Sequence, residues 1–142
     1  MPDRQIWFFK FGCWVAFATA LVHLVGHVIG PQAPANDTER QLVTLATSYH
    51  YQLPGGASRS LMDFMDGFSL MFEVLVAGLG AVGLAVVKRA GQDVPLMLAV
   101  ARALAVTSAA LLVISHVFFF IVPTLFIAMM ALCFAFSSVS RT

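Results

Sequence analysis

Residues 94–139 read VPLMLAVARALAVTSAALLVISHVFFFIVPTLFIAMMALCFAFSSV, and this almost unbroken apolar stretch decides the fold. About 20 residues of α-helix already cross the hydrocarbon core of a bilayer, so the stretch is too long for one crossing. The chain must therefore fold back on itself, and we expect a hairpin around Phe118–Pro123. This predicts two membrane spans, at approximately 95–117 and 122–139.

Two further apolar stretches lie nearer the N-terminus. The first, at 11–30, follows a cluster of aromatic residues typical of a membrane interface, and Pro31 ends it because proline cannot continue a helical hydrogen-bond ladder. It is longer than the roughly 7–15 apolar residues of a cleaved signal peptide, so we expect it to be retained. The second, at 61–87, stops at Lys88 and Arg89. The chain is thus predicted to cross the membrane four times.

The composition agrees with this class of protein. Of the 142 residues, 60% are hydrophobic and 11% are charged, with a mean hydropathy of +0.89. Soluble domains average roughly 45–50% apolar and about 25% charged residues, so this chain has too few polar groups to cover a water-exposed surface. We expect an all-α, four-helix transmembrane bundle that forms one domain, 1–142. The net charge of +1 argues against nucleic acid as a partner.

The only long polar segment is the loop 31–60, between the first two spans. Within it, Thr38–Tyr49 places apolar residues on one face, which favours a short amphipathic helix at the membrane surface. Asn36 and Glu39 have the spacing of a capping box at the start of that helix. Pro54-Gly55-Gly56 then predicts a turn.

The distribution of basic residues predicts the orientation. Four crossings place six basic residues on one side, and only Arg40 and Arg59 on the other. The six are Arg4, Lys10, Lys88, Arg89, Arg102 and Arg141. Under the positive-inside rule both termini are cytoplasmic and loop 31–60 faces outward. We expect a multi-pass inner-membrane protein, with the loop in the periplasm if the source is a Gram-negative bacterium.

Several ionisable residues fall inside the spans, where they are rare and usually functional. His23 and His27 are one helical turn apart, and His116 lies just before the expected hairpin. On the second span a stripe follows spacings of four, three, four and three: Arg59, Asp63, Asp66, Leu70 and Glu73. All four histidines of the chain, including His50 in the loop, fall in the outward half.

Histidine and carboxylate groups on facing helices are the ligands from which bundles build metal sites. We therefore expect an outward-facing centre that binds a transition metal or haem, and the donor atoms alone do not select the metal. Its candidate ligands are His23, His27, Asp66, Glu73 and His116. Asp63 and His50 are expected to support these ligands or to cover them.

Other interpretations of the same residues remain open. Arg59 and Asp63 have the spacing of an ion pair, and Asp63 could instead cap its helix. The histidines could bond to Asp66 or Glu73 and simply hold helices together, as in a non-catalytic accessory subunit of a larger membrane complex or a homo-oligomer. Glu73 lies near mid-bilayer, where a lone carboxylate is costly, and could be the proton site of a small dimeric transporter.

The two cysteines, Cys13 and Cys133, are far apart in the sequence and lie in apolar stretches. Neither belongs to a CxxC pair, so a thiol-redox motif and a zinc ribbon are both absent. We expect both to be small buried apolar residues.

Overall fold

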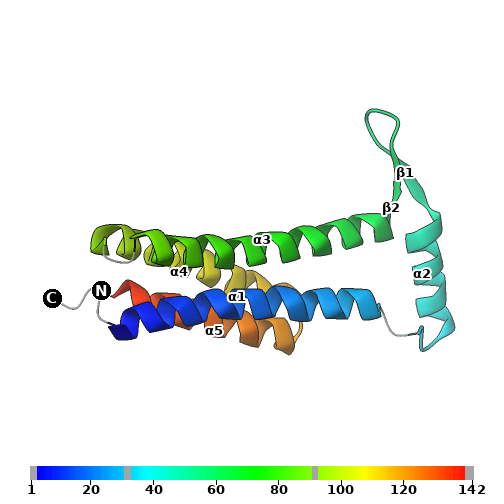
Figure 1. Ribbon diagram of the computed structural model, residues 1–142. Helices are drawn as coiled ribbons and strands as arrows, with labels where there is room; N and C mark the ends of the chain where they lie inside the picture. The colour runs from blue at the N-terminus through cyan, green and yellow to red at the C-terminus, as the bar shows by residue number, and fades with distance from the viewer. Residues whose placement is uncertain (1–2, 31–32, 91–92, 140–142) are drawn as a thin grey trace.

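The computed structural model describes residues 3–30, 33–90 and 93–139. Four long helices run side by side: α1 (Asp3–Ile29), α3 (Leu61–Ala90), α4 (Val94–Phe118) and α5 (Ile121–Ser138) (Figure 1). All four are long and apolar enough to cross a membrane. The prediction of four spans is thus confirmed, and the chain is a multi-pass membrane protein. We call the end of the bundle that carries residues 33–60 the loop end, and the opposite end the terminal end.

The helices are not packed as an even four-sided bundle. α1 packs along both α3 and α5, and α4 packs along α5, whereas α3 and α4 touch at few places. Most of the fully buried side chains come from α1, α4 and α5, among them Phe9, Cys13, Met97 and Phe134. The seam between α3 and α4 is therefore the most open part of the bundle.

Small residues let α1 and α3 approach closely near the terminal end. A Cβ atom on Gly80 would lie 2.8 Å from the backbone oxygen of Cys13, and one on Gly83 would lie 2.5 Å from its sulfur. Cys13 and Cys133 are both buried and free, as the sequence predicts. This contact sets the register in which the loop ends of α1 and α3 face each other.

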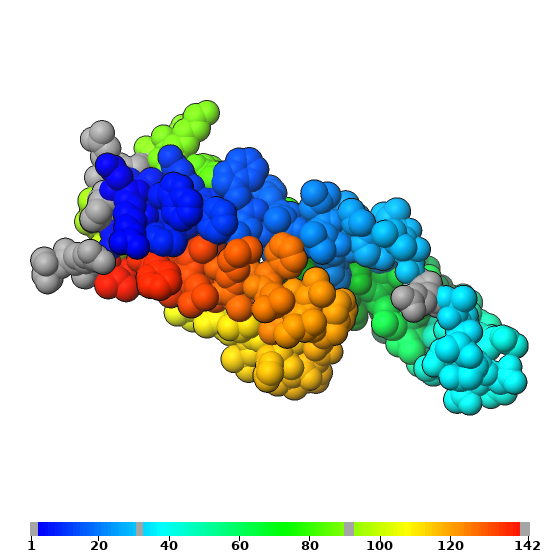
Figure 2. All heavy atoms as spheres, turned by 90° about the horizontal axis from the view of Figure 1, so that it is seen from below, coloured from blue at the N-terminus to red at the C-terminus, as the bar shows by residue number. Residues whose placement is uncertain are grey.

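The helices differ in length, and this shapes the loop end. α5 has 18 residues and α3 has 30, so the turn between α4 and α5 stops short of the tips of α1 and α3. Figure 2 shows atoms of α3 in the space between that turn and the loop-end segment. Beyond the turn, the α1–α3 pair has no cover from α4 or α5. α1 also begins at Asp3, earlier than the predicted 11, because the aromatic cluster is part of the helix.

The loop segment contains helix α2 (Asp37–Ser48) and a short antiparallel hairpin of β1 (His50–Gln52) and β2 (Ser58–Ser60). Asn36 is the N-cap of α2, since its side chain accepts from the backbone N–H of Glu39 at 2.9 Å. The Glu39 carboxylate accepts in turn from the backbone N–H of Ala35 at 2.8 Å, one residue before the position expected for a capping box. The predicted turn joins the two strands, and Gly55 and Gly56 both have positive φ angles there. The strands themselves were not predicted, because three-residue strands carry too little alternation to be seen in a sequence.

Candidate functional site

Two apolar cavities adjoin in the loop-end half of the bundle. One, of about 280 Å³, lies between α1, α3 and the start of α5. The other, of about 420 Å³, lies between α3, α4 and the start of α5, at the open α3–α4 seam. Both are lined by the same five residues: His23, Ser69, Phe72, Phe120 and Pro123. These residues stand between the two cavities and make them parts of one site.

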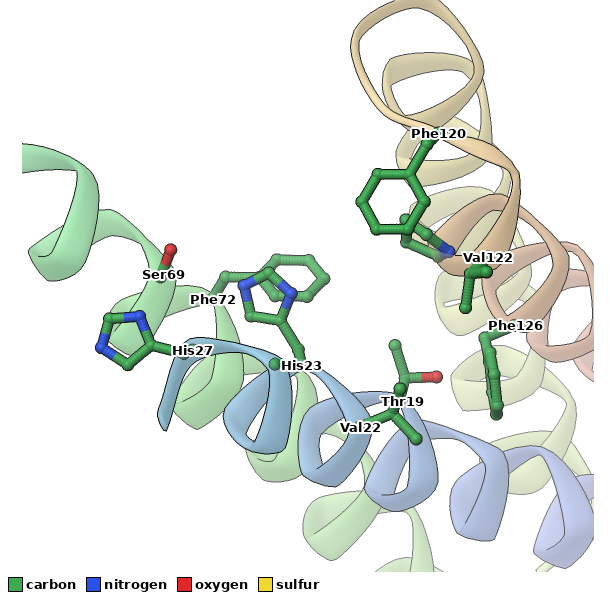
Figure 3. A pocket seen from close by; sticks show the side chains of 11 residues that line it. Thr19, Val22, His23, His27, Ser69, Phe72, Phe120, Val122 and Phe126 are labelled. Carbon is green, nitrogen blue, oxygen red and sulfur yellow. The ribbon is translucent and has the colours of Figure 1, made fainter. Parts of the chain in front are cut away.

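His23 lies at the centre of the site. Its ring meets Phe72 of α3 edge-on, with centroids 5.1 Å apart. In Figure 3 the His23 ring and Phe72 lie on one side of the opening, with Phe120, Val122 and Phe126 on the other. It is the one ionisable side chain that lines both cavities among the described residues.

The other polar groups of the cavity walls are mostly engaged. The hydroxyl of Thr19 donates to the carbonyl of Val15 at 2.8 Å. The hydroxyls of Ser115 and Thr124 lie 2.9 Å apart and join α4 to α5. Two other polar side chains remain: Ser69, which lines both cavities, and His27, which lines the smaller one. The His23 imidazole is thus the one ring, among the described residues, that can offer a hydrogen bond to both cavities.

His27 and Asp66 lie one turn further toward the loop end. His27 Nδ1 is 4.0 Å from Asp66 Oδ1, at the outer limit of an ion pair. The His27 side chain is 24% exposed and that of Asp66 is 56% exposed, so the pair lies at the rim of the site. The sequence left open that a histidine of the first span bonds to Asp66 or Glu73; the structure sets His27 beside Asp66, at a distance longer than a hydrogen bond.

Glu73 lies deeper, one turn below Ser69 on α3. It is buried, with 6% of its surface exposed, and its Oε1 has no hydrogen-bond partner in the described part of the chain. It lines neither cavity. Glu73 therefore stays apart from His23 and from the His27–Asp66 pair.

His116 is not brought to the site. It is exposed on α4 and lines neither cavity, whereas its neighbour Ser115 is buried and lines the larger one. A register difference of one residue on a helix turns the side chain by about 100°. The interaction across the α4–α5 turn is thus made by Ser115 and Thr124, neither of which the sequence pattern singled out.

Asp63 and His50 belong to the start of α3 and to the hairpin. Asp63 Oδ2 accepts from the Ser60 N–H at 2.7 Å, and the Ser60 hydroxyl accepts from the Asp63 N–H at 3.1 Å. Asp63 is therefore a helix cap. It forms no ion pair with Arg59, which donates to the Ser58 carbonyl instead. His50 is exposed, and its Nδ1 lies 2.9 Å from the Ser48 carbonyl.

Of the five candidate metal ligands, then, the structure places His23 and His27 in the wall of the smaller cavity and sets His27 beside Asp66. Across residues 3–30, 33–90 and 93–139, no group of three or more His, Cys, Asp or Glu side chains is arranged to hold a metal ion. The aromatic and serine residues that complete the site lay outside the sequence prediction, which considered only ionisable groups.

Comparison with known proteins gives no match: no family model, curated protein or solved structure is significantly similar to this chain. The function is therefore argued from the site alone.

Proposed function

We propose that this membrane protein binds an amphiphilic ligand dissolved in the bilayer, in the paired cavities around His23. The observation that carries the proposal is the meeting of two largely apolar cavities at a single imidazole. Ligand sites are typically concave spaces of roughly 300–1,000 Å³ with apolar walls and a few convergent polar groups. The two spaces together have this size and this character.

The chemistry of the walls defines the ligand class. Phe72, Phe120 and Phe126 offer aromatic faces to an apolar body, and His23 offers a hydrogen bond to one polar group. The larger cavity lies at the seam between α3 and α4, where few contacts would need to break. A ligand already in the membrane reaches the site through this seam without passing through water.

Haem is one member of this class. Its macrocycle is flat and apolar, and its iron accepts an imidazole as an axial ligand. His23 would be that ligand, with the phenylalanine side chains against the macrocycle. The proposal predicts a single protein ligand to the iron. His116 and His50 are exposed and line neither cavity, and His27 lies one turn along the same helix as His23, so it cannot bind the opposite side of the iron.

The second candidate is a transition-metal ion at the rim, favoured by the His27–Asp66 distance. Histidine nitrogen and carboxylate oxygen each bind zinc at about 2.0–2.2 Å, so two ligand atoms of one tetrahedral ion lie roughly 3.4 Å apart. The 4.0 Å between His27 Nδ1 and Asp66 Oδ1 would have to shorten by about 0.6 Å to bind one ion. His23 would be the nearest further histidine along α1.

We propose that the loop end faces outward in a bacterial inner membrane. Six of the eight basic residues lie in the first eight residues of α1, within about ten residues of the connection at 91–92, or after α5, and only two lie in the loop segment. The ligand site would then lie in the outer leaflet.

The test is the content of the purified protein. We expect protein isolated in mild detergent without chelators to carry a near-stoichiometric amphiphile, seen by mass spectrometry of a solvent extract. Haem would show instead as a visible absorption band with one iron per chain. His23→Ala and Ser69→Phe should each remove the ligand, the first by loss of the polar contact and the second by filling both cavities.

His116→Ala is the matched control, because this histidine is exposed and lines neither cavity. It should keep the full ligand content. Equal ligand content in the wild type and the Ser69→Phe variant would contradict the proposal. Elemental analysis distinguishes the amphiphile from a metal ion bound by His27 and Asp66. Such a metal ion should be lost in Asp66→Asn and kept in Ser69→Phe.

A further inference from the structure

Helix α2 lies at the level where the membrane must end. Lys10 on α1 is the last basic residue before a long uncharged stretch. From Lys10 to Ile29, the end of α1, the helix rises roughly 29 Å at about 1.5 Å per residue. The hydrocarbon core is about 30 Å thick, so a boundary at Lys10 places the other boundary at the end of α1. The chain enters α2 a few residues later.

The orientation of α2 fits this level. In Figure 1 α2 lies across the direction of the four spans, beyond the loop ends of α1 and α3. Both of those helices are membrane spans, and α2 is joined to α1 on one side and, through the hairpin, to α3 on the other. A helix held across the spans at the boundary runs along the membrane surface.

One face of α2 is apolar and has no protein cover. Leu42 and Leu45 are one turn apart on this face and are 64% and 63% exposed. Tyr49, the C-cap residue, continues the spacing and is 61% exposed, with its ring edge-on to that of Tyr51. The opposite face carries Thr44 and the Arg40–Asp37 ion pair, at 3.0 Å. No residue of α2 is buried against the bundle. The apolar face is therefore free to meet the bilayer beside the spans.

We infer that α2 is an interfacial helix, whose Leu42–Leu45–Tyr49 face rests in the headgroup–acyl boundary of the leaflet at the loop end. Amphipathic helices of this kind bury their apolar face about 5–10 Å into that boundary. Asp37, Glu39 and Arg40 give the helix more acidic than basic side chains. Its contact with lipid thus depends on apolar burial and requires no anionic headgroups. This inference is independent of the ligand site.

The experiment places an environment-sensitive fluorophore at single cysteines, Leu45→Cys and Thr44→Cys, which are adjacent in sequence but on different faces. Cys13 and Cys133 are changed to alanine. If the protein without these two cysteines folds poorly, both are kept. They are buried, and labelling of the protein without an added cysteine then measures how much fluorophore they take up. The protein is reconstituted in phosphatidylcholine vesicles with and without phosphatidylcholine that carries a nitroxide quencher on its acyl chain.

We expect the nitroxide lipid to quench the fluorescence of the probe at position 45 about twofold more, or better, than that of the probe at position 44. The probe at position 45 should also emit at the shorter wavelength of the two. Replacing part of the phosphatidylcholine with phosphatidylglycerol should leave this difference unchanged. Equal quenching at the two positions would overturn the inference. So would a probe at position 45 that is shifted in emission but not quenched by lipid, because a protein partner or a second copy would then cover the face.

Discussion

His27 on α1 and Asp66 on α3 face each other across the helix pair, with Nδ1 4.0 Å from Oδ1, and His27 also lines the smaller cavity with residues at the start of α5. The pair is open to its surroundings because the short α5 leaves the tips of α1 and α3 uncovered. This placement puts the pair at the rim of the proposed ligand site, and we expect it to contribute little to the stability of the fold.

Asp66→Asn should therefore change the free energy of unfolding by less than about 1 kcal/mol, as for other exposed ion pairs. Thermal unfolding in detergent, followed by circular dichroism, measures the change. A much larger loss would mean that Asp66 is buried in the membrane-embedded protein, against its 56% exposure.

Gly80→Ala should destabilise the protein, because its Cβ would lie 2.8 Å from the backbone oxygen of Cys13 and would push α1 and α3 apart. Overpacking of this kind typically costs about 1–3 kcal/mol. The control is Gly78→Ala on the same helix, whose Cβ would have nothing within 4 Å. The control should be neutral or slightly stabilising, and equal melting temperatures for the two variants would contradict the close helix contact.

Thr124→Val should loosen the α4–α5 turn, since its hydroxyl lies 2.9 Å from that of Ser115. Interhelical hydrogen bonds in membrane proteins contribute about 0.6 kcal/mol on average and up to roughly 1.7 kcal/mol. A double-mutant cycle with Ser115→Ala measures the coupling. Additive effects of the two changes would show that the hydroxyls do not interact.

Glu73→Lys should lower the yield of folded protein sharply, whereas Glu73→Gln should be tolerated. The site is buried and its Oε1 lacks a partner, so glutamine fits the same space without adding charge. A lysine near the centre of a span costs about 2.5–3.5 kcal/mol on insertion. Monodisperse elution from a sizing column reports folding, and equal yields of the two variants would place Glu73 in contact with water.

The proposed orientation is tested with an impermeant thiol reagent on intact cells. Cysteines at Ala35 and Ala57, both exposed at the loop end, should react, and one at Asp3, exposed at the terminal end, should not. The reversed pattern would place the loop end, and the ligand site with it, on the cytoplasmic side.

The number of spans and the presence of helix α2 could be predicted from the sequence, because each depends on residues that are close together along the chain. Apolar length alone limits how often a chain can cross a bilayer, so residues 94–139 had to form two spans. The start of α2 depends on Asn36 and Glu39, which are neighbours along the chain and bond to each other wherever the rest of the protein lies. The same holds for the cap that Ser60 and Asp63 form on α3.

Only the tertiary structure decided which side chains form the site. α4 and α5 are apolar almost all round, so their sequences contain no stripe that distinguishes a buried face from one that meets lipid. Lipid is as apolar as a protein core, and helix faces in a membrane are chosen by shape and by a few hydrogen bonds. The structure therefore turns Ser115 inward and His116 outward, and it sets Phe72 beside His23 with Phe120 across the cavity. Those choices depend on the register between helices, which the Gly80–Cys13 contact and the Ser115–Thr124 bond fix in space.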